Sequence, residues 1–397
     1  MIGIRRLIPS LAALVGLLGA ACAEDPLAQD PITAPLAQVT AGVLHTCGTA
    51  TDGITYCWGW NQNGQIGDGS GTDRPLPVLV SGTVGFTAVT SGGAHSCGVT
   101  SAGATHCWGL NLSGQIGDGT SMERRTPVPV SGGLVLTALS AGGAYTCGLA
   151  ADSLAHCWGW NLHGQLGDGA TDDRHVPAAV AGGFKFVTIA TGVRHTCALA
   201  ADSTAYCWGA NEAGQLGTSF GPDTARPVPV DGGLKFTTIT LGFAHTCGLA
   251  AAGDAYCWGS NSVGQLGDST IGGSGTPNAV QGDLQFTALE AGGTHTCAIA
   301  DAAAAYCWGN GSFGQLGRLA SHLCASDIGP TGCGPVPGPV SGGLTFVALT
   351  GGNHHTCGLT TGGVAYCWGL NDRGQLGDGT HQTRTAPTRV ANQEGVP

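Results

Sequence analysis

Residues 45–69 read HTCGTATDGITYCWGWNQNGQIGDG, and variants of this segment occur six more times along the chain. Each copy carries two cysteines that are ten positions apart in the sequence. The pairs are Cys47 with Cys57, Cys97 with Cys107, Cys147 with Cys157, Cys197 with Cys207, Cys247 with Cys257, Cys297 with Cys307, and Cys357 with Cys367. Successive pairs are separated by 50 residues five times and then by 60. A fixed period of this length predicts a repeat architecture.

A single repeat contains four short segments with the composition of strands, separated by turn-forming residues. In residues 75–119 they are PLPVLV, FTAVTSG, HSCGVT and THCWG, after which NLSGQIGDG leads to the next copy. The proline-led segment suits a sheet edge, because proline cannot donate a ladder hydrogen bond. No segment has the 3.6-residue period of a helix. The sequence therefore predicts an all-β fold, a seven-bladed β-propeller of four-stranded antiparallel blades.

The two ends of the repeat region suggest how the ring closes. The first copy has no proline-led segment ahead of it, whereas the last copy continues into APTRVAN at residues 386–392. This final segment resembles the missing strand. We therefore expect the N- and C-terminal strands to complete one blade together, which would remove free sheet edges that otherwise favour aggregation.

The two cysteines of each copy are spaced for a disulfide across a hairpin. If residues 51–53 form a three-residue loop with Gly53 in the left-handed region, Cys47 and Cys57 face each other. Counting outward from the loop places them at a non-hydrogen-bonded position, with Cα atoms about 4.5 Å apart. That separation lies within the range of disulfides.

The cysteine count also indicates the compartment. Of the 17 cysteines, the repeats use all but three, and Cys324 and Cys333 in an insertion form an eighth pair in this interpretation. Only Cys22 remains. So many paired cysteines predict an oxidising compartment.

The N-terminal residues have the composition of a secretory signal. Arg5 and Arg6 precede an apolar run over residues 7–18, and small residues follow. The run is too short for a membrane span that stays in the mature protein. We therefore assign residues 1–21 to a signal peptide.

A tether is predicted between this signal and the propeller. Residues 22–36 are polar and contain three prolines, which suits a linker, and the propeller is expected over residues 37–393. LLGAAC resembles the lipobox of bacterial lipoproteins, which predicts lipidation of Cys22. Cleavage after Ala23 by an ordinary signal peptidase is the alternative. The first case gives an outer-membrane or cell-surface lipoprotein, and the second a periplasmic or secreted protein.

The charge balance limits the class of partner. The formal net charge is -11, charged residues make up only 10% of the chain, and the two lysines are Lys185 and Lys235. Nucleic-acid-binding proteins present a basic face or stripe. We therefore expect no nucleic-acid partner, and membrane contact only through the N-terminal lipid.

Candidate binding residues are those that depart from the repeat. An insertion at residues 318–334 contains RLASHLCASDIGPTGC and falls between strands, where binding residues are often placed on a rigid scaffold. His322 and Asp327 are its polar candidates. Trp60 and Trp160 follow the Trp-Gly of two copies, where the other copies have Leu, Ala, Ser or Asn. Exposed tryptophan is a common anchor for protein or sugar ligands.

Repeated polar residues could suggest metal sites, but a structural role is favoured. One position holds His45, His95, His195, His245, His295 and His355, with Tyr145 in the remaining copy. We expect these histidines to bond local backbone. A turn position holds Asp68, Asp118, Asp168, Asp268 and Asp378, with Arg74, Arg125, Arg174, Arg226 and Arg384 shortly downstream. Calcium binding by these turns is the alternative to a structural pairing. We expect no metal, no cofactor and no catalytic residue.

The repeat unit YCWGxNxxGQLGDG, followed by PVxV, FxAL and GGxHTCGL, resembles the repeat of the regulator of chromosome condensation family. The resemblance covers residues 37–392 and implies a seven-bladed propeller. The nuclear founding member is a nucleotide-exchange factor for a small GTPase that docks on chromatin, and a secreted bacterial inhibitor of β-lactamases is similar in fold. The resemblance carries over scaffold positions but no functional residue to this chain.

These patterns together predict a monomeric, non-catalytic binding module or scaffold at a bacterial cell envelope. Its partner would be a protein or an envelope glycan. The alternative is a protein inhibitor or regulator of an extracytoplasmic enzyme.

Overall fold

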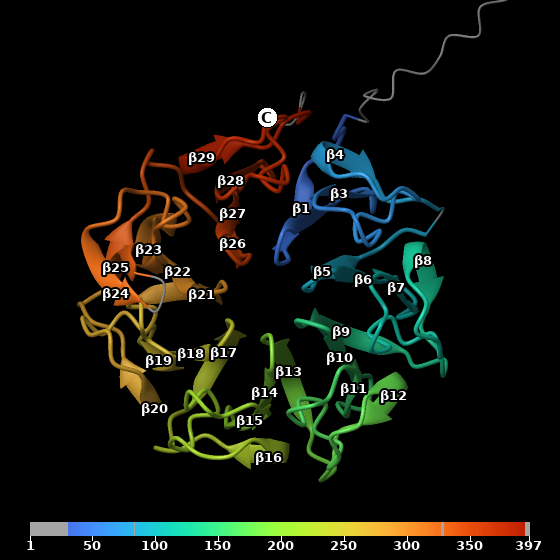
Figure 1. Cartoon of the computed structure of the whole chain (residues 1–397), viewed down its shortest axis with the longest axis horizontal. Helices are drawn as coiled ribbons and strands as arrows, with labels where there is room; N and C mark the ends of the chain where they lie inside the picture. The colour runs from blue at the N-terminus through green and yellow to red at the C-terminus, as the bar shows by residue number, and fades with distance from the viewer. Residues whose placement is uncertain (1–30, 83, 327–328, 394–397) are drawn as a thin grey trace, which may run out of the picture.

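The computed structural model describes residues 31–82, 84–326 and 329–393. Within these ranges, strands β1 to β29 form seven antiparallel sheets that surround a central axis (Figure 1). The helical element found there is a short 3-10 turn, η1 (Asp301–Ala303). No helix in the described ranges has the length and apolar character needed to cross a membrane. The predicted all-β, seven-bladed propeller is confirmed.

The four strands of a blade run from the axis to the rim. The innermost strands are β1 (Leu36–Ala41), β5 (Ala88–Ser91), β9 (Leu136–Ala141), β13 (Phe186–Thr191), β17 (Phe236–Leu241), β21 (Phe286–Ala291) and β26 (Ala348–Gly351). The second strands are β2 (His45–Ala50), β6 (His95–Val99), β10 (Tyr145–Ala150), β14 (His195–Ala200), β18 (His245–Ala250), β22 (His295–Ala300) and β27 (His355–Leu359). The third strands are β3 (Thr55–Gly59), β7 (Thr105–Gly109), β11 (Ala155–Gly159), β15 (Ala205–Gly209), β19 (Ala255–Gly259), β23 (Ala305–Asn310) and β28 (Ala365–Gly369). The fourth strands are β4 (Arg74–Leu79), β8 (Arg124–Pro129), β12 (Arg174–Ala179), β16 (Thr224–Pro229), β20 (Ser274–Ala279), β25 (Gly329–Pro339) and β29 (Arg384–Arg389).

The antiparallel order of each blade separates its loops onto two faces of the ring. The turn between the first and second strands and the loop between the third and fourth strands lie at the same end of the sheet. In blade 1 they are joined by a hydrogen bond from the Trp60 amide to the Leu44 carbonyl, 2.9 Å long. We call this end the long-loop face, because residues 60–73 and their equivalents form its main loops. The opposite, short-loop face carries the hairpin turns and the connections to the next blade.

The hairpin between the second and third strands has the predicted register. Cys47 pairs with Cys57, and their Cα atoms are 4.0 Å apart in a disulfide. The turn residue Gly53 has a φ of 85°, in the left-handed region. Ser153 and Ser203 occupy the same turn position with φ values of 67° and 66°, so these hairpins keep the same turn without glycine.

Disulfides join sixteen cysteines of the described chain, in the pairs that the sequence predicts. Seven bridges cross the hairpins, and the eighth lies within the insertion. The hairpin bridges join Cys47 to Cys57, Cys97 to Cys107, Cys147 to Cys157, Cys197 to Cys207, Cys247 to Cys257, Cys297 to Cys307, and Cys357 to Cys367. The insertion bridge joins Cys324 to Cys333. Cys22, together with the predicted signal peptide and most of the predicted tether, lies outside the described residues.

The ring does not close through a shared blade, so that expectation is wrong. Each sheet is built from one uninterrupted stretch of chain, with β1 to β4 in blade 1 and β26 to β29 in blade 7. The C-terminal segment APTRVAN enters β29, which pairs with β28 of its own copy. The proline-led segment is therefore the last strand of each copy. It forms an antiparallel pair with the Trp-Gly strand that precedes the long loop, and it is not the first strand of the following blade.

The same contact joins every pair of neighbouring blades, including the first and the last. The indole of Trp108 donates to the carbonyl oxygen of Gln65 in the preceding long loop, at 2.9 Å. Trp58 makes this bond to Gln375 of blade 7, at 3.0 Å. A Cβ added at Gly67 would lie 2.7 Å from the Trp108 indole nitrogen. The loop therefore approaches the indole too closely for any residue larger than glycine.

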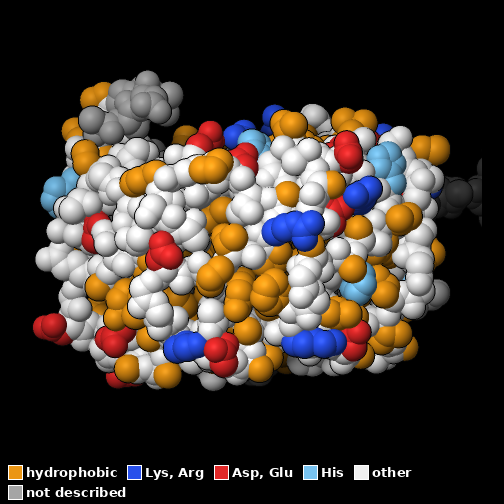
Figure 2. All heavy atoms as spheres, turned by 90° about the horizontal axis from the view of Figure 1, so that it is seen from below, with side chains coloured by type: hydrophobic (Ala, Val, Ile, Leu, Met, Phe, Trp, Pro, Cys, Tyr) orange, Lys and Arg blue, Asp and Glu red, His pale blue; other side chains and the backbone are white. Residues whose placement is uncertain are grey.

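The hydrophobic core lies between the blades. One cluster combines Ile66 and the Cys47–Cys57 disulfide of blade 1 with Phe86 and Trp108 of blade 2. An equivalent cluster at the junction of blades 7 and 1 contains Trp58 and Leu376. On the side of the ring seen in Figure 2, charged side chains are separated by apolar and uncharged surface.

Candidate functional site

The six repeated histidines are buried and bridge neighbouring blades. His45 Nε2 lies 2.9 Å from the hydroxyl of Ser96 on the next blade, and that hydroxyl donates to the Gln65 carbonyl at 2.9 Å. Because the hydroxyl proton is directed to the carbonyl, the imidazole Nε2 carries a proton and donates it. His355 makes the equivalent bond to Thr46 at 3.0 Å and so completes the ring.

These contacts correct one expectation about the histidines. Their partners are side chains on the neighbouring blade, whereas we expected local backbone. Burial, together with the nearby His95 and His355, lowers the pKa of His45 to about 3. The rings therefore stay neutral. Among the described residues, no group of three or more His, Cys, Asp or Glu side chains is arranged to hold a metal ion.

The long loops are held in shape by a repeated polar network. The Asn61 amide donates to Asp68 at 3.0 Å, and its carbonyl oxygen accepts the Ile66 amide at 3.0 Å. Asp68 also accepts the Ser70 amide at 2.9 Å and the Arg74 guanidinium at 2.7 Å. This network explains why the asparagine recurs along the chain and why five of the seven copies carry the aspartate.

Four of the five Asp turns hold an ion pair with an arginine, whereas Asp268 accepts a hydrogen bond from Asn278. Burial by itself would raise the pKa of Asp68, but hydrogen bonds from Ser70 and Arg74 outweigh it and hold the pKa below its ordinary value. The equivalent pair in blade 2 is Asp118 with Arg124; the predicted partner Arg125 instead pairs with Glu123.

On this rigid base, the long-loop face presents apolar side chains to solvent. In the part of the chain that the structure describes, eight of the fourteen exposed large hydrophobic residues lie between a third strand and the end of the loop that follows it. They are Leu112, Met122, Leu162, Phe220, Ile271, Phe313, Leu319 and Leu323. We call them the apolar rim residues. Leu112 and Leu162 occupy one repeat position on adjacent blades and are 75% and 66% exposed, whereas other blades place Gln, Glu, Ser or Asp there.

Three of the four predicted binding residues are described, and they lie on the same face with mixed exposure. Trp60 and Trp160 are half-buried at the start of their loops, and the Trp160 ring packs edge-on against His163 with centroids 5.3 Å apart. His322 is exposed on β24 (His322–Ser326), where its Nδ1 lies 2.8 Å from the Ser321 hydroxyl. Asp327 falls outside the described residues.

Our sequence interpretation missed the apolar rim residues. A signal for them exists, because comparing the copies position by position shows leucine at residues 112 and 162 where polar residues otherwise stand. Trp60 and Trp160 were selected for their aromatic side chains, although the structure leaves each of them only partly exposed.

The insertion forms a hairpin instead of an irregular loop. β24 pairs with the first half of β25 and makes blade 6 the one five-stranded sheet of the described chain. The Cys324–Cys333 disulfide crosses this hairpin. Leu323 projects from it with 77% of its surface exposed.

Arg318 replaces the usual aspartate at the base of this hairpin. Its guanidinium donates to the Cys307 carbonyl at 3.2 Å and lies against Gly334 and Gly338, where any Cβ would collide with it. Burial lowers the pKa of Arg318. The loss of the Asp–Arg ion pair in blade 6 is therefore offset by an arginine bound to backbone.

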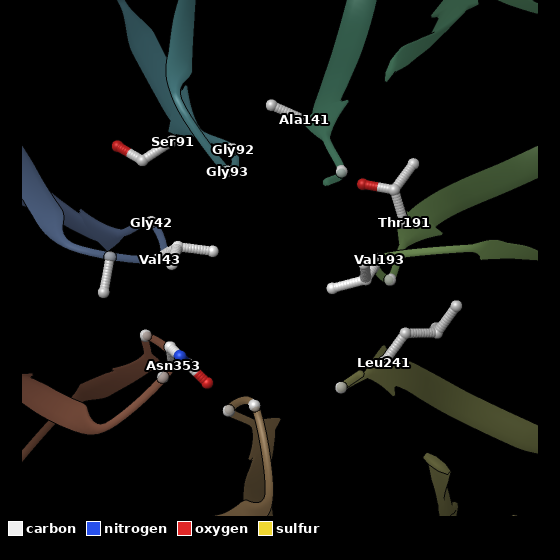
Figure 3. A pocket seen from close by; sticks show the side chains of 18 of the residues that line it. Gly42, Val43, Ser91, Gly92, Gly93, Ala141, Thr191, Val193, Leu241 and Asn353 are labelled. Carbon is white, nitrogen blue, oxygen red and sulfur yellow. The ribbon is translucent and has the colours of Figure 1, made fainter. Parts of the chain in front are cut away.

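A second candidate site is the axial channel. It is lined by the ends of the innermost strands and the turns that follow them, and it encloses about 160 Å³. Figure 3 shows Val43 and Val193 facing each other across this opening, with Leu241 and Asn353 beside them. Glu290 is the single ionisable side chain among the residues that line it.

Two sequence profiles of the regulator of chromosome condensation (RCC1) repeat each match five segments of the chain. One profile matches residues 52–99, 152–199, 202–249, 252–299 and 362–397. A second profile of the same repeat matches residues 36–65, 186–215, 236–265, 286–315 and 346–375. The first profile alone covers more than half of the chain.

Similar proteins are found among curated sequences and solved structures. The ultraviolet-B receptor UVR8 of Arabidopsis thaliana is 39% identical over 74 residues, which make up 18% of this chain and 17% of the receptor. Yeast RCC1 (Prp20), solved bound to Kap60, has a TM-score of 0.76 at 19% identity, covering 99% of this chain and 92% of that one. Human WBSCR16 has a TM-score of 0.75 at 20% identity, covering 85% and 94%. Structural likeness at these identities shows the fold alone.

Proposed function

The chain belongs to the regulator of chromosome condensation (RCC1) repeat family, and we propose that it is an exported, non-catalytic protein that binds a protein partner through its long-loop face at a bacterial cell envelope. The observation that carries this proposal is the concentration of the apolar rim residues on that face. Propellers of this family suggest a binding or regulatory module.

The disulfides support a location outside the cytoplasm. Eight bridges in one chain indicate an oxidising, extracytoplasmic environment, because reducing systems keep cytosolic thiols free. The predicted signal peptide at residues 1–21 agrees with export. Lipidation of Cys22 would remove the remaining thiol and hold the propeller at the membrane through the tether.

The chemistry of the long-loop face favours a protein over a glycan. Solvent-exposed leucines gain free energy when a partner removes their apolar surface from water, at about 25 cal/mol per Å². Glycan sites depend more on exposed aromatic rings and polar groups, and here both tryptophans are half-buried. Solved propellers of the same fold bind proteins: the yeast protein was crystallised with Kap60, and its binding to Gsp1p and histones has been described.

The decisive experiment compares the two faces of the ring. The triple variant Leu112→Ser, Leu162→Ser and Leu323→Ser removes apolar surface from the long-loop face. Exposed substitutions of this kind change stability by about 0.5 kcal/mol or less, so the variant should fold. Once affinity capture from envelope extracts has identified a partner, its Kd for the triple variant should rise at least about tenfold, as expected for apolar anchors.

A matched control removes apolar surface from the short-loop face. Ile54, Val135 and Val347 are 39%, 52% and 51% exposed there, and the variant Ile54→Ser, Val135→Ser, Val347→Ser should keep wild-type affinity. If the partner instead lost affinity for the control variant and kept it for the long-loop variant, binding would belong to the short-loop face and the proposal would be refuted.

The anchor requires a separate test. Replacement Cys22→Ser should move the protein from the membrane fraction to the soluble fraction, because one lipidated terminus would be lost. Intact mass of the membrane-bound form should show a thioether-linked lipid at residue 22. An unmodified N-terminus that starts after Ala23 would replace the lipoprotein assignment by secretion.

A further inference from the structure

The axial channel has one position at which blade 6 breaks the pattern. Near the end of the innermost strand, most blades carry a short hydroxyl side chain, blade 4 carries alanine, and blade 6 carries a carboxylate. In order around the ring the residues are Thr40, Thr90, Ser140, Ala190, Thr240, Glu290 and Thr350. The repeat therefore identifies Glu290 as a departure that the fold does not require.

The hydroxyls at this position have a structural role. Thr240 Oγ1 accepts the Ala291 amide at 2.9 Å, and Thr350 Oγ1 accepts the Ala41 amide at 3.0 Å, so each ties one blade to the next. Glu290 performs the same task, because its carboxylate accepts the amide of Gly351. A threonine would be sufficient for this bond.

The carboxylate has acceptor capacity left over. Its Oε2 lies 3.5 Å from the Thr240 hydroxyl, a distance at the limit of a hydrogen bond. An ionised carboxylate offers about four lone-pair sites, so these two contacts leave room for a further donor. No ion pair found among the described residues involves Glu290, and the other residues that line the channel are uncharged.

An isolated carboxylate in this narrow channel is unfavourable as an anion. Burial raises the pKa of Glu290 to about 7, although the Gly351 amide and the Thr240 hydroxyl act in the opposite direction. Buried charges are normally paired. A cation in the channel would restore the anionic form.

The residues around Glu290 indicate what kind of cation the channel would accept. Leu241 and Phe243 of blade 5, and Val193 of blade 4, make one side of the channel apolar. On the other side lies Asn353 of blade 7, whose side-chain oxygen is buried against Gly293. Figure 3 shows Leu241, Val193 and Asn353 around the same opening.

We propose that the axial channel binds a primary ammonium group carried on a short aliphatic stem. The ammonium donates to the Glu290 carboxylate, while the stem packs against Leu241 and Phe243. A single carboxylate balances one positive charge, whereas divalent cations in proteins are usually held by several oxygen ligands that include more than one carboxylate. The ammonium group could belong to a small free amine or to a lysine side chain of a polypeptide.

The test titrates the mature chain with n-butylamine by calorimetry at about pH 8.5, where the amine stays protonated because its pKa resembles that of lysine. n-Butanol serves as the uncharged isostere and potassium chloride as the inorganic cation. We expect butylamine to bind at least about tenfold more tightly than either control. At about pH 5.5 its affinity should fall severalfold, because Glu290 is then protonated.

Two variants isolate the carboxylate. Glu290→Thr restores the residue of the other blades and keeps an acceptor for the Gly351 amide, and Glu290→Gln keeps the shape of the side chain. Both should melt as the wild type does and lose butylamine binding at least tenfold. Equal affinity in Glu290→Thr, or equal binding of potassium, would overturn the proposal.

A further titration with a lysine derivative distinguishes the two sources of the ammonium group. Nα-acetyl-lysine amide that binds more tightly than butylamine would assign the site to a polypeptide side chain, and weaker binding would assign it to a free amine. Both results keep the ammonium assignment. Absence of heat with both amines at about pH 8.5 would refute it.

Discussion

In blade 2, the hairpin of β6 and β7 joins Cys97 to Cys107 and places Trp108 against the preceding blade. In blade 6, the hairpin of β22 and β23 repeats each of these contacts. The loops that follow the two hairpins keep the same Gln-Leu/Ile-Gly contact to the neighbouring blade and differ elsewhere. Blade 2 continues into a loop with an Asp118–Arg124 ion pair, whereas blade 6 continues into Arg318 and a disulfide-bonded hairpin.

The comparison distinguishes residues that hold neighbouring blades together from surface residues that can differ between copies. Hairpin residues form hydrogen bonds to neighbouring blades, so a substitution in one copy affects the packing of at least two blades. The long loops contact neighbours mainly through their Gln-Leu/Ile-Gly segment, as in Gln65 and Gly67. The remaining loop residues are free to differ, and the apolar rim residues are found among them.

The largest expected effect is acid unfolding caused by the hairpin histidines. Burial lowers the pKa of His195 and His295 to about 3, whereas in the unfolded chain they titrate near 6.5. Below pH 6.5 the unfolded state therefore binds more protons. Stability is complete above that pH and falls as the pH decreases toward the folded values, at about 2 kcal/mol per histidine by pH 5.

Denaturant titrations at pH 7, 6 and 5 would measure this loss. All six buried histidines should contribute, so the unfolding midpoint should decrease steeply. A midpoint that is unchanged between pH 7 and pH 5 would show that the rings accept protons without losing their interblade bonds.

The next effect tests whether the Gln segment of the loop belongs to the core. Trp108→Ala and Trp308→Ala each remove a fully buried indole that bonds to the preceding loop, at Gln65 and Gln265 respectively. Each should lower the free energy of unfolding by about 3–5 kcal/mol, as large-to-small core changes do. Guanidinium unfolding should give equal losses in the two blades, and a much smaller loss for Trp308→Ala would mean that blade 6 is packed differently.

The smallest effect compares a hairpin disulfide with the loop disulfide. Replacing Cys297 and Cys307 by serine opens a fully buried bridge and should cost up to about 3 kcal/mol in the chain-entropy model. Replacing Cys324 and Cys333 should leave the thermal midpoint unchanged and make only the loop hairpin sensitive to protease. Equal loss of thermal stability in both double variants would show that the loop hairpin supports the ring.

The regular part of the fold could be predicted from the sequence because its causes are local. The ten-residue cysteine spacing and the Gly53 turn determine the pairing of Cys47 with Cys57, and seven copies determine the number of blades. The starting point of a blade could not be predicted in the same way. A periodic sequence has no inherent phase, so PLPVLV could be read as the first strand of one blade or the last strand of another.

The candidate site was predicted less completely, for a physical reason. Trp60 and Trp160 stand out in the sequence because large aromatic side chains are common binding anchors. The exposure of these side chains, however, depends on how the loop folds over them. Glu290 was passed over because nothing in the sequence shows that its strand lines the axis. The structure supplies both facts.

The spacing of the disulfides also has a consequence for how the chain is made. Each hairpin bridge joins cysteines ten residues apart, and the loop bridge joins cysteines nine apart. A pair so close can oxidise as soon as its own hairpin has formed in an oxidising environment, before the next copy of the repeat has folded. Biosynthesis in order along the chain would then select the correct partner for each cysteine from sixteen, without waiting for the ring to close.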